Sequence, residues 1–197
     1  MDPETAAPEV PDFNDVGQRN AWFTATPDPW VEMVRLSYGG DRTHAAAVER
    51  RVTSAEPAQH AEMEQKLIAA LGHPELTGAA RRFVCEMLGL IGSAACVPVV
   101  AVLLESERTA DHARLALDRI AGASVDAAYR AALTKLRGAA KAGLIGSIAM
   151  RGDGEALAIL PGIARAADES AEVKVAAARA VERLARGRFE SEKGVGR

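Results

Sequence analysis

Aromatic residues are scarce in this sequence, although apolar residues are not. Aromatics make up 4% of the 197 residues, whereas hydrophobic residues of all types make up 48%. A chain of this length can bury a substantial core, and that core must consist mainly of alanine, leucine, valine and isoleucine. Small aliphatic side chains let helices approach closely, so the composition favours a core between packed helices.

Cysteine is nearly absent as well, and no metal-binding motif surrounds the two that are present. Cys85 and Cys96 both lie in apolar stretches, where a free cysteine behaves as a small hydrophobic residue. We expect two buried free thiols, with a disulfide or a reactive thiol as the alternative. Two thiols without a histidine motif make a poor metal site, and we expect no metal and no cofactor.

The chain also lacks a long apolar run and an excess of basic residues. No stretch approaches the roughly 18 apolar residues of a membrane-spanning helix. The formal net charge is -3, whereas binding to a phosphate backbone needs a concentrated basic face. The start, MDPETAAPEV, is acidic and contains proline, unlike a secretory signal. We expect a cytoplasmic protein that binds neither nucleic acid nor membranes.

A helical pattern recurs along the chain with a period of about 30 residues. In GAARRFVCEMLGLIG, apolar residues at spacings of three and four draw one helical stripe. The stripe consists of Ala80, Val84, Met87, Leu88 and Ile91, and it recurs at 113–120, 140–148 and 173–184. The matching residues Leu88, Leu117, Ile148 and Val181 are separated by 29, 31 and 33 residues.

Another apolar helix is expected before each stripe, at 62–71, 95–104, 125–136 and 155–166. We expect Thr77, Ser124 and Ser170 to be N-caps, because a hydroxyl there accepts a bond from a first-turn amide. Gly92 should end its helix in the left-handed conformation. Pro161 should kink its helix without ending it. Short antiparallel helix pairs cannot cover their apolar faces alone, so they stack into an α-solenoid.

The stretch GAARRFVCEMLGLIGSAACVPVVAVLL carries the most specific repeat pattern. One helix ends in leucine, glycine, any residue, isoleucine and glycine, and the next begins with valine and proline. In this the chain resembles the HEAT-repeat family, particularly bacterial arrays of the phycobilisome-lyase type, over residues 59–186. The resemblance implies an all-α fold, a right-handed α-solenoid of about five antiparallel helix pairs.

Four segments follow from this interpretation. They are a flexible, acidic, proline-rich N-terminal segment at 1–20, a divergent first repeat at 21–58, the HEAT-repeat array at 59–187 and a polar tail at 188–197. The divergent repeat should contain helices at 30–37 and 43–54, and the last helix of the array should end near Arg186.

Basic residues follow the first stripe position in three repeats, at Arg81, Lys141 and Lys174. One interpretation pairs them with acids in the turns, which are Glu75, Glu107 and Glu169. The other places them on the concave surface that the HEAT resemblance implies, where extended partners of solenoids lie. Exposed ion pairs contribute only about 0–1 kcal/mol each, so stability alone does not require these residues.

The candidate partner-binding groove therefore combines charges of both signs, which favours a peptide over a phosphate backbone. It consists of Arg81, Arg82, Glu86, Asp111, Arg114, Lys141, Lys174 and Arg179. Aromatic residues near the N-terminus offer a second candidate, an anchor formed by Trp22, Phe23 and Trp30. These aromatics either cover the apolar end of the first repeat or form a recognition segment for a partner.

No arrangement of residues points to catalysis. The four histidines share no ligand spacing, and neither a nucleophile motif nor a glycine-rich phosphate loop is present. We expect a non-catalytic scaffold or adaptor that binds a protein or peptide on its concave surface. The alternatives are a cofactor handler resembling a bilin lyase, an enzyme resembling the HEAT-like DNA glycosylases, and a spacer within a larger multidomain protein.

Overall fold

A computed structural model describes residues 14–17 and 27–194, and these residues form helices and no strands. The prediction of an all-α fold is thereby confirmed. In chain order the elements are α2 (Pro29–Glu32), η1 (Met33–Arg35), α3 (Thr43–Thr53), α4 (Pro57–Leu71), α5 (Gly78–Ile91), α6 (Val97–Val102), η2 (Leu103–Glu105), α7 (Ala110–Leu117), α8 (Ala123–Ala132), α9 (Gly138–Arg151), η3 (Gly154–Ala158), α10 (Leu160–Arg165) and α11 (Ala171–Gly194). The η elements are short 3-10 helices.

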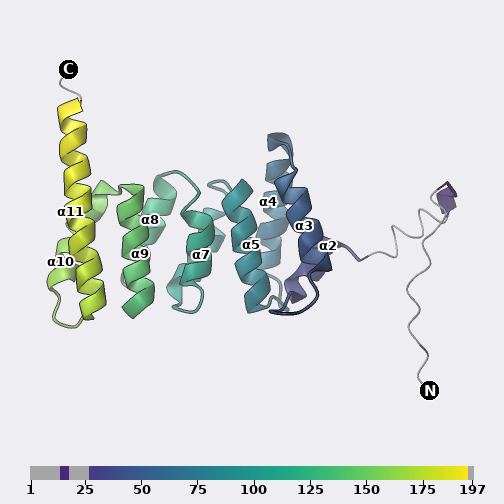
Figure 1. The fold of residues 1–197 in the computed structure, drawn as a ribbon, viewed down its shortest axis with the longest axis horizontal. Helices are drawn as coiled ribbons and strands as arrows, with labels where there is room; N and C mark the ends of the chain where they lie inside the picture. The colour runs from purple at the N-terminus through teal and green to yellow at the C-terminus, as the bar shows by residue number, and fades with distance from the viewer. Residues whose placement is uncertain (1–13, 18–26, 195–197) are drawn as a thin grey trace.

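Four of these helices lie side by side along the long axis of the molecule (Figure 1). In this helix row, α5 packs against α7, α7 against α9, and α9 against α11. The other four helices from α4 to α10 each contact the row helix that follows in the chain, so α4 contacts α5 and α6 contacts α7. Each row helix is therefore packed both by a neighbour within the row and by the helix before it.

The core between these helices is aliphatic, as the composition predicts. Three of the four residues that mark the repeat, Leu88, Leu117 and Ile148, are fully buried. The fourth, Val181, is only partly buried. It lies on α11, which has no later helix packed against it in the described part of the chain.

Two of the three predicted N-caps are confirmed. The hydroxyl of Thr77 accepts a hydrogen bond from the amide three residues later at 3.0 Å, and the hydroxyl of Ser170 does the same at 3.3 Å. The prediction for Ser124 is wrong, because α8 already begins at Ala123. Gly122 precedes that helix with a φ of 120°, a conformation that glycine adopts without a steric penalty.

Gly92 ends α5, but the prediction of a left-handed conformation is wrong. Its φ of -67° and ψ of 150° are those of an extended residue. Glycine is required there by close packing, because a Cβ atom would lie 2.4 Å from the carbonyl oxygen of Leu88 and 3.1 Å from Sγ of Cys96. The left-handed helix end is found instead at Gly152, after α9.

Pro161 does not kink a continuous helix. The expected helix at 155–166 is divided into η3 and α10, and Pro161 lies in the first turn of α10. Proline is tolerated in a first turn because its missing N–H has no partner there within the helix. The last helix also differs from its prediction, since α11 continues past Arg186 to Gly194 and includes part of the expected tail.

Both cysteines are buried free thiols, as predicted. Burial raises the pKa of Cys85 and of Cys96 to about 12. The thiolate is the form that reacts with electrophiles, and very little of it is present in the folded protein at pH 8.

We therefore expect an aromatic disulfide reagent to label neither thiol of the native protein at pH 8 within minutes. In concentrated urea both thiols should react within seconds, because unfolding returns their pKa to that of a free cysteine, about 8.5. The absorbance of the released thiolate measures both rates. Rapid labelling of the native protein would contradict the burial of these side chains.

Trp30 is the part of the predicted N-terminal anchor that the structure describes. Its side chain belongs to the core and is 8% exposed, with the ammonium of Lys66 5.5 Å from the ring centroid. Trp22 and Phe23 lie outside the described residues, as does most of the segment 1–20. A recognition role for this segment stays a prediction.

Candidate functional site

Each helix of the row has an exposed stripe on the side opposite its buried stripe. The four stripes together are called the row surface here. They consist of exposed and partly exposed residues: Arg82, Glu86 and Leu90 on α5, Asp111, Arg114 and Leu115 on α7 with Asp118 and Arg119 directly after it, Ala139, Gly143, Gly146 and Met150 on α9, and Val175 and Arg179 on α11. Five of the eight predicted groove residues belong to it: Arg82, Glu86, Asp111, Arg114 and Arg179.

Ion pairs within single helices organise the charges on α5 and α7. Nε of Arg82 donates to Glu86 at 2.8 Å, and Nη1 of Arg114 donates to Asp111 at 2.9 Å. Both pairs follow from a spacing of three or four residues along a helix. The row surface therefore carries alternating charges that are already partly paired.

Arg114 is also fixed by a network that joins three helices. Its Nε donates to the hydroxyl of Ser147 on α9 at 2.9 Å, and this hydroxyl donates to Asp118 at 3.0 Å. The phenol of Tyr129 on α8 donates to the same carboxylate at 2.8 Å. Burial and then the Asp118 carboxylate raise the pKa of Tyr129, so the phenol stays protonated. A Cβ at Gly143 would lie 2.3 Å from Nη1 of Arg114, so glycine makes room for the guanidinium.

Two of the other predicted groove residues are engaged elsewhere. Lys141 is buried, and its ammonium donates to Glu169, which is one of the turn acids proposed as its partner. Lys174 is half-buried, with its ammonium 3.5 Å from the carbonyl oxygen of Ala167. A second turn acid, Glu75, pairs with Arg35 at 2.6 Å and not with the expected basic residue of the stripe.

The eighth predicted residue, Arg81, is half-buried, and its positive charge contributes to lowering the pKa of His112 on α7. Nδ1 of His112 is buried, with no hydrogen-bond partner among the described residues. Burial is the largest cause that lowers the pKa of His112, followed by the charges of Arg81 and Arg82. The imidazole is therefore neutral at pH 7.

The sequence interpretation missed two arginines that join successive row helices. Nη1 of Arg151 on α9 donates to the carbonyl oxygen of Leu117, the last residue of α7, at 3.1 Å. It also donates to the carbonyl oxygen of Ile120, just after α7, at 2.8 Å. Nε of Arg183 on α11 donates in the same way to Ala149 of α9 at 3.0 Å. These two arginines are 32 residues apart, which is close to the repeat period and is the signal that identifies them.

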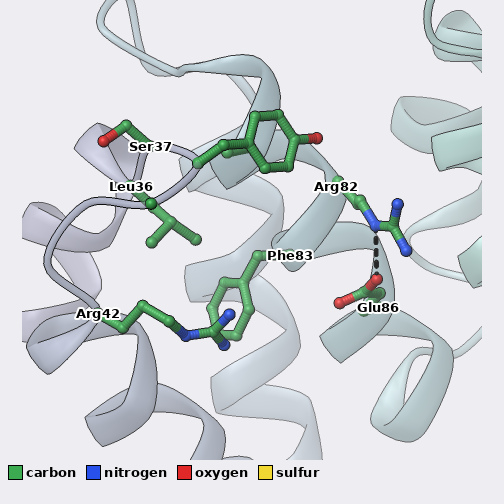
Figure 2. A pocket seen from close by; sticks show the side chains of 9 residues that line it. Leu36, Ser37, Arg42, Arg82, Phe83 and Glu86 are labelled. Carbon is green, nitrogen blue, oxygen red and sulfur yellow. Dashed lines mark hydrogen bonds and ion pairs between the residues drawn. The ribbon is translucent and has the colours of Figure 1, made fainter.

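A pocket of about 290 Å³ lies at one end of the row surface, where the loop 36–42 folds against α5 (Figure 2). Its apolar wall consists of the nearly buried side chains of Leu36, Ala79 and Phe83. Arg42 reaches the pocket from the loop, and Arg82 from α5. No local pattern indicates this pocket, because its two sides are about 40 residues apart in the sequence.

Within residues 14–17 and 27–194, no group of three or more histidine, cysteine, aspartate or glutamate side chains is placed to hold a metal ion. None of the helices described there is both long enough and apolar enough to cross a bilayer.

Comparisons of the chain with models of protein families, with curated proteins and with solved structures find no match. The HEAT family therefore stays a resemblance that rests on the repeat pattern. The row surface and the pocket beside it are the candidate functional sites of the described residues.

Proposed function

We propose that this protein is a non-catalytic adaptor of the HEAT type that binds an extended peptide or protein segment on the row surface. The proposed architecture is a right-handed solenoid of about five antiparallel helix pairs. The observation that carries the proposal is the side-by-side packing of α5, α7, α9 and α11. Stacked helices of this kind present one long surface along the array, and such surfaces bind extended partners.

The chemistry of the row surface favours a polypeptide. Arginines and carboxylates alternate on α5 and α7, which suits a partner with side chains of both signs. A phosphate backbone would meet Glu86, Asp111 and Asp118 along with the arginines. Electrostatic complementarity of this mixed kind gives specificity for one sequence over another.

The exposed stripe of α9 adds a steric argument. Ala139 and Gly146 are exposed and carry almost no side chain, and a Cβ at Gly146 would meet no atom within 4 Å, whereas Gly143 is covered by the guanidinium of Arg114. The backbone of a partner can therefore approach α9 closely. Two arginines flank this stripe: Arg179 on α11 is exposed, and Arg114 on α7 is held in place by its bonds to Asp111 and Ser147.

A charge exchange on the row surface tests this proposal. Peptides are selected from a random display library against the wild-type protein. They are then synthesised with both ends capped, so that they resemble internal segments of a chain and carry no terminal carboxylate. We expect the double variant Asp111→Lys with Arg179→Glu to weaken their binding by at least about tenfold, or 1.4 kcal/mol. Fluorescence anisotropy measures the dissociation constants.

The matched control exchanges one acid and one base elsewhere on the array. Glu105→Lys with Lys135→Glu changes two exposed residues of η2 and the segment after α8 and leaves the net charge the same. We expect this control to bind as the wild type does. Equal weakening by both exchanges, or the absence of any selected peptide, would count against the row surface as the binding site.

A further inference from the structure

The geometry points to the pocket between the loop 36–42 and α5 as a binding site for the C-terminal carboxylate of a peptide whose last residue is apolar. This inference rests on the proposed function, because Arg82 and Glu86 belong to both the pocket and the row surface. It goes further by assigning one end of the bound peptide and its chemistry.

The loop that forms one side of the pocket is held in place before any ligand binds. The amide of Thr77 donates to the carbonyl oxygen of Val34 at 3.0 Å, and the Thr77 hydroxyl donates to that of Leu36. Within the loop, the amide of Gly40 donates to Ser37 at 3.2 Å, and Gly39 has a φ of 76°. A preformed loop lowers the entropic cost of binding.

Two guanidinium groups at the pocket have donors to spare. Arg42 is 62% exposed and lies 3.7 Å from Glu49, which is beyond hydrogen-bond distance. Arg82 is 53% exposed and uses Nε for its bond to Glu86. No hydrogen bond from Nη1 or Nη2 of either arginine is found among the described residues. Guanidinium groups bind carboxylates through such paired N–H donors.

The size and the apolar wall of the pocket indicate what kind of group lies beside the bound carboxylate. A volume of about 290 Å³ is at the lower limit of small-molecule sites, which start near 300 Å³. It suits one amino-acid residue better than a cofactor. Leu36, Ala79 and Phe83 form the apolar wall. A C-terminal residue carries an apolar side chain and a carboxylate on one Cα atom, so both groups reach such a small site together.

The charge balance favours a single negative charge. Glu86 pairs with Arg82 through a hydrogen bond of 2.8 Å, whereas Glu49 lies 3.7 Å from Arg42, so the less compensated positive charge at the pocket is that of Arg42. A carboxylate matches this charge. A phosphate dianion would bring an additional negative charge close to Glu86, so the pocket should discriminate against it.

Titration of the ¹⁵N-labelled full chain with short synthetic peptides tests the assignment. The probe is N-acetyl-Gly-Ser-Ala-Leu with a free carboxylate, compared with its C-terminal amide and with phenyl phosphate. We expect the acid to shift the amide resonances of Gly39 and Phe83. The amide and phenyl phosphate should bind at least about tenfold more weakly, a difference of 1.4 kcal/mol.

Exposed arginines supply the variants and their control. Arg42→Gln and Arg82→Gln should each weaken binding of the acid at least fivefold, whereas Arg165→Gln, an exposed residue of α10, should have no effect. Unchanged dispersion of the amide resonances shows that each variant is folded. Equal binding of acid and amide, tighter binding of phenyl phosphate, or no shift in the pocket would overturn the assignment.

These outcomes are separable from failure of the proposed function. The capped, internal peptides selected on the row surface have no carboxylate at their ends, so their sensitivity to the exchange at Asp111 and Arg179 does not depend on the pocket. If that sensitivity is found and the acid probe fails, the carboxylate assignment alone is wrong. If the probe binds and no internal peptide does, the row surface beyond the pocket is not a peptide-binding site.

Discussion

Replacement of Lys141 by alanine should lower the free energy of unfolding by about 3–5 kcal/mol. The side chains of Lys141 and Glu169 are 8% and 10% exposed, and they form an ion pair between α9 and the turn before α11. Removal of the ammonium leaves the carboxylate of Glu169 buried without a partner, and an uncompensated buried charge is costly. Urea denaturation followed by circular dichroism measures the change.

The double variant Lys141→Met with Glu169→Leu separates this cause from a simple loss of packing. It removes both charges and keeps apolar volume at both positions, so it should recover most of the lost stability. Lys135→Ala serves as the matched control, because Lys135 is exposed and should change stability by no more than about 0.5 kcal/mol. A loss below about 1 kcal/mol for Lys141→Ala would mean that the pair is solvated.

Gly89→Ala should destabilise the protein by about 1–3 kcal/mol, although alanine is the better helix former. A Cβ at Gly89 would lie 2.6 Å from the carbonyl oxygen of Leu115, so α5 and α7 would have to move apart. The shift strains the packing between these two row helices. Thermal or urea unfolding of the purified variant gives the change.

Gly146→Ala is the matched control for this prediction, on the exposed stripe of α9. A Cβ there meets no atom within 4 Å, so the change should stabilise α9 by about 0.5–1 kcal/mol through its higher helix propensity. The two substitutions are chemically identical and should differ in sign. The same sign for both would contradict the close approach of α5 and α7 at Gly89.

The helices of the row were predictable because each has a clear apolar stripe. The spacing that placed Leu88, Leu117 and Ile148 in register also placed them in the core. The helix at 155–166 was predicted less well, because a proline early in an apolar segment is compatible with a kink or with a new first turn. The structure has the new first turn, at Pro161.

Most of the predictable contacts of the candidate site are local, although the pairing of Lys141 with Glu169 was one of the two alternatives for the basic residues of the stripe. Arg82 with Glu86 and Arg114 with Asp111 follow from spacing along one helix. The bond from Arg114 to Ser147 spans 33 residues and depends on how α7 packs against α9. Burial of Lys141 depends likewise on the position of the α10–α11 turn that carries its partner. A helical stripe gives the face of a residue, but it does not say which turn covers that face.

The most direct test of peptide binding on the row surface is a map of the bound peptide by amide chemical shifts. A selected internal peptide is added to the ¹⁵N-labelled protein, and the shifted resonances are assigned. We expect the shifts to follow the exposed stripes of α5, α7, α9 and α11, including Arg82, Asp111, Gly146 and Arg179. Shifts confined to α6, α8 and α10 would contradict the proposed function.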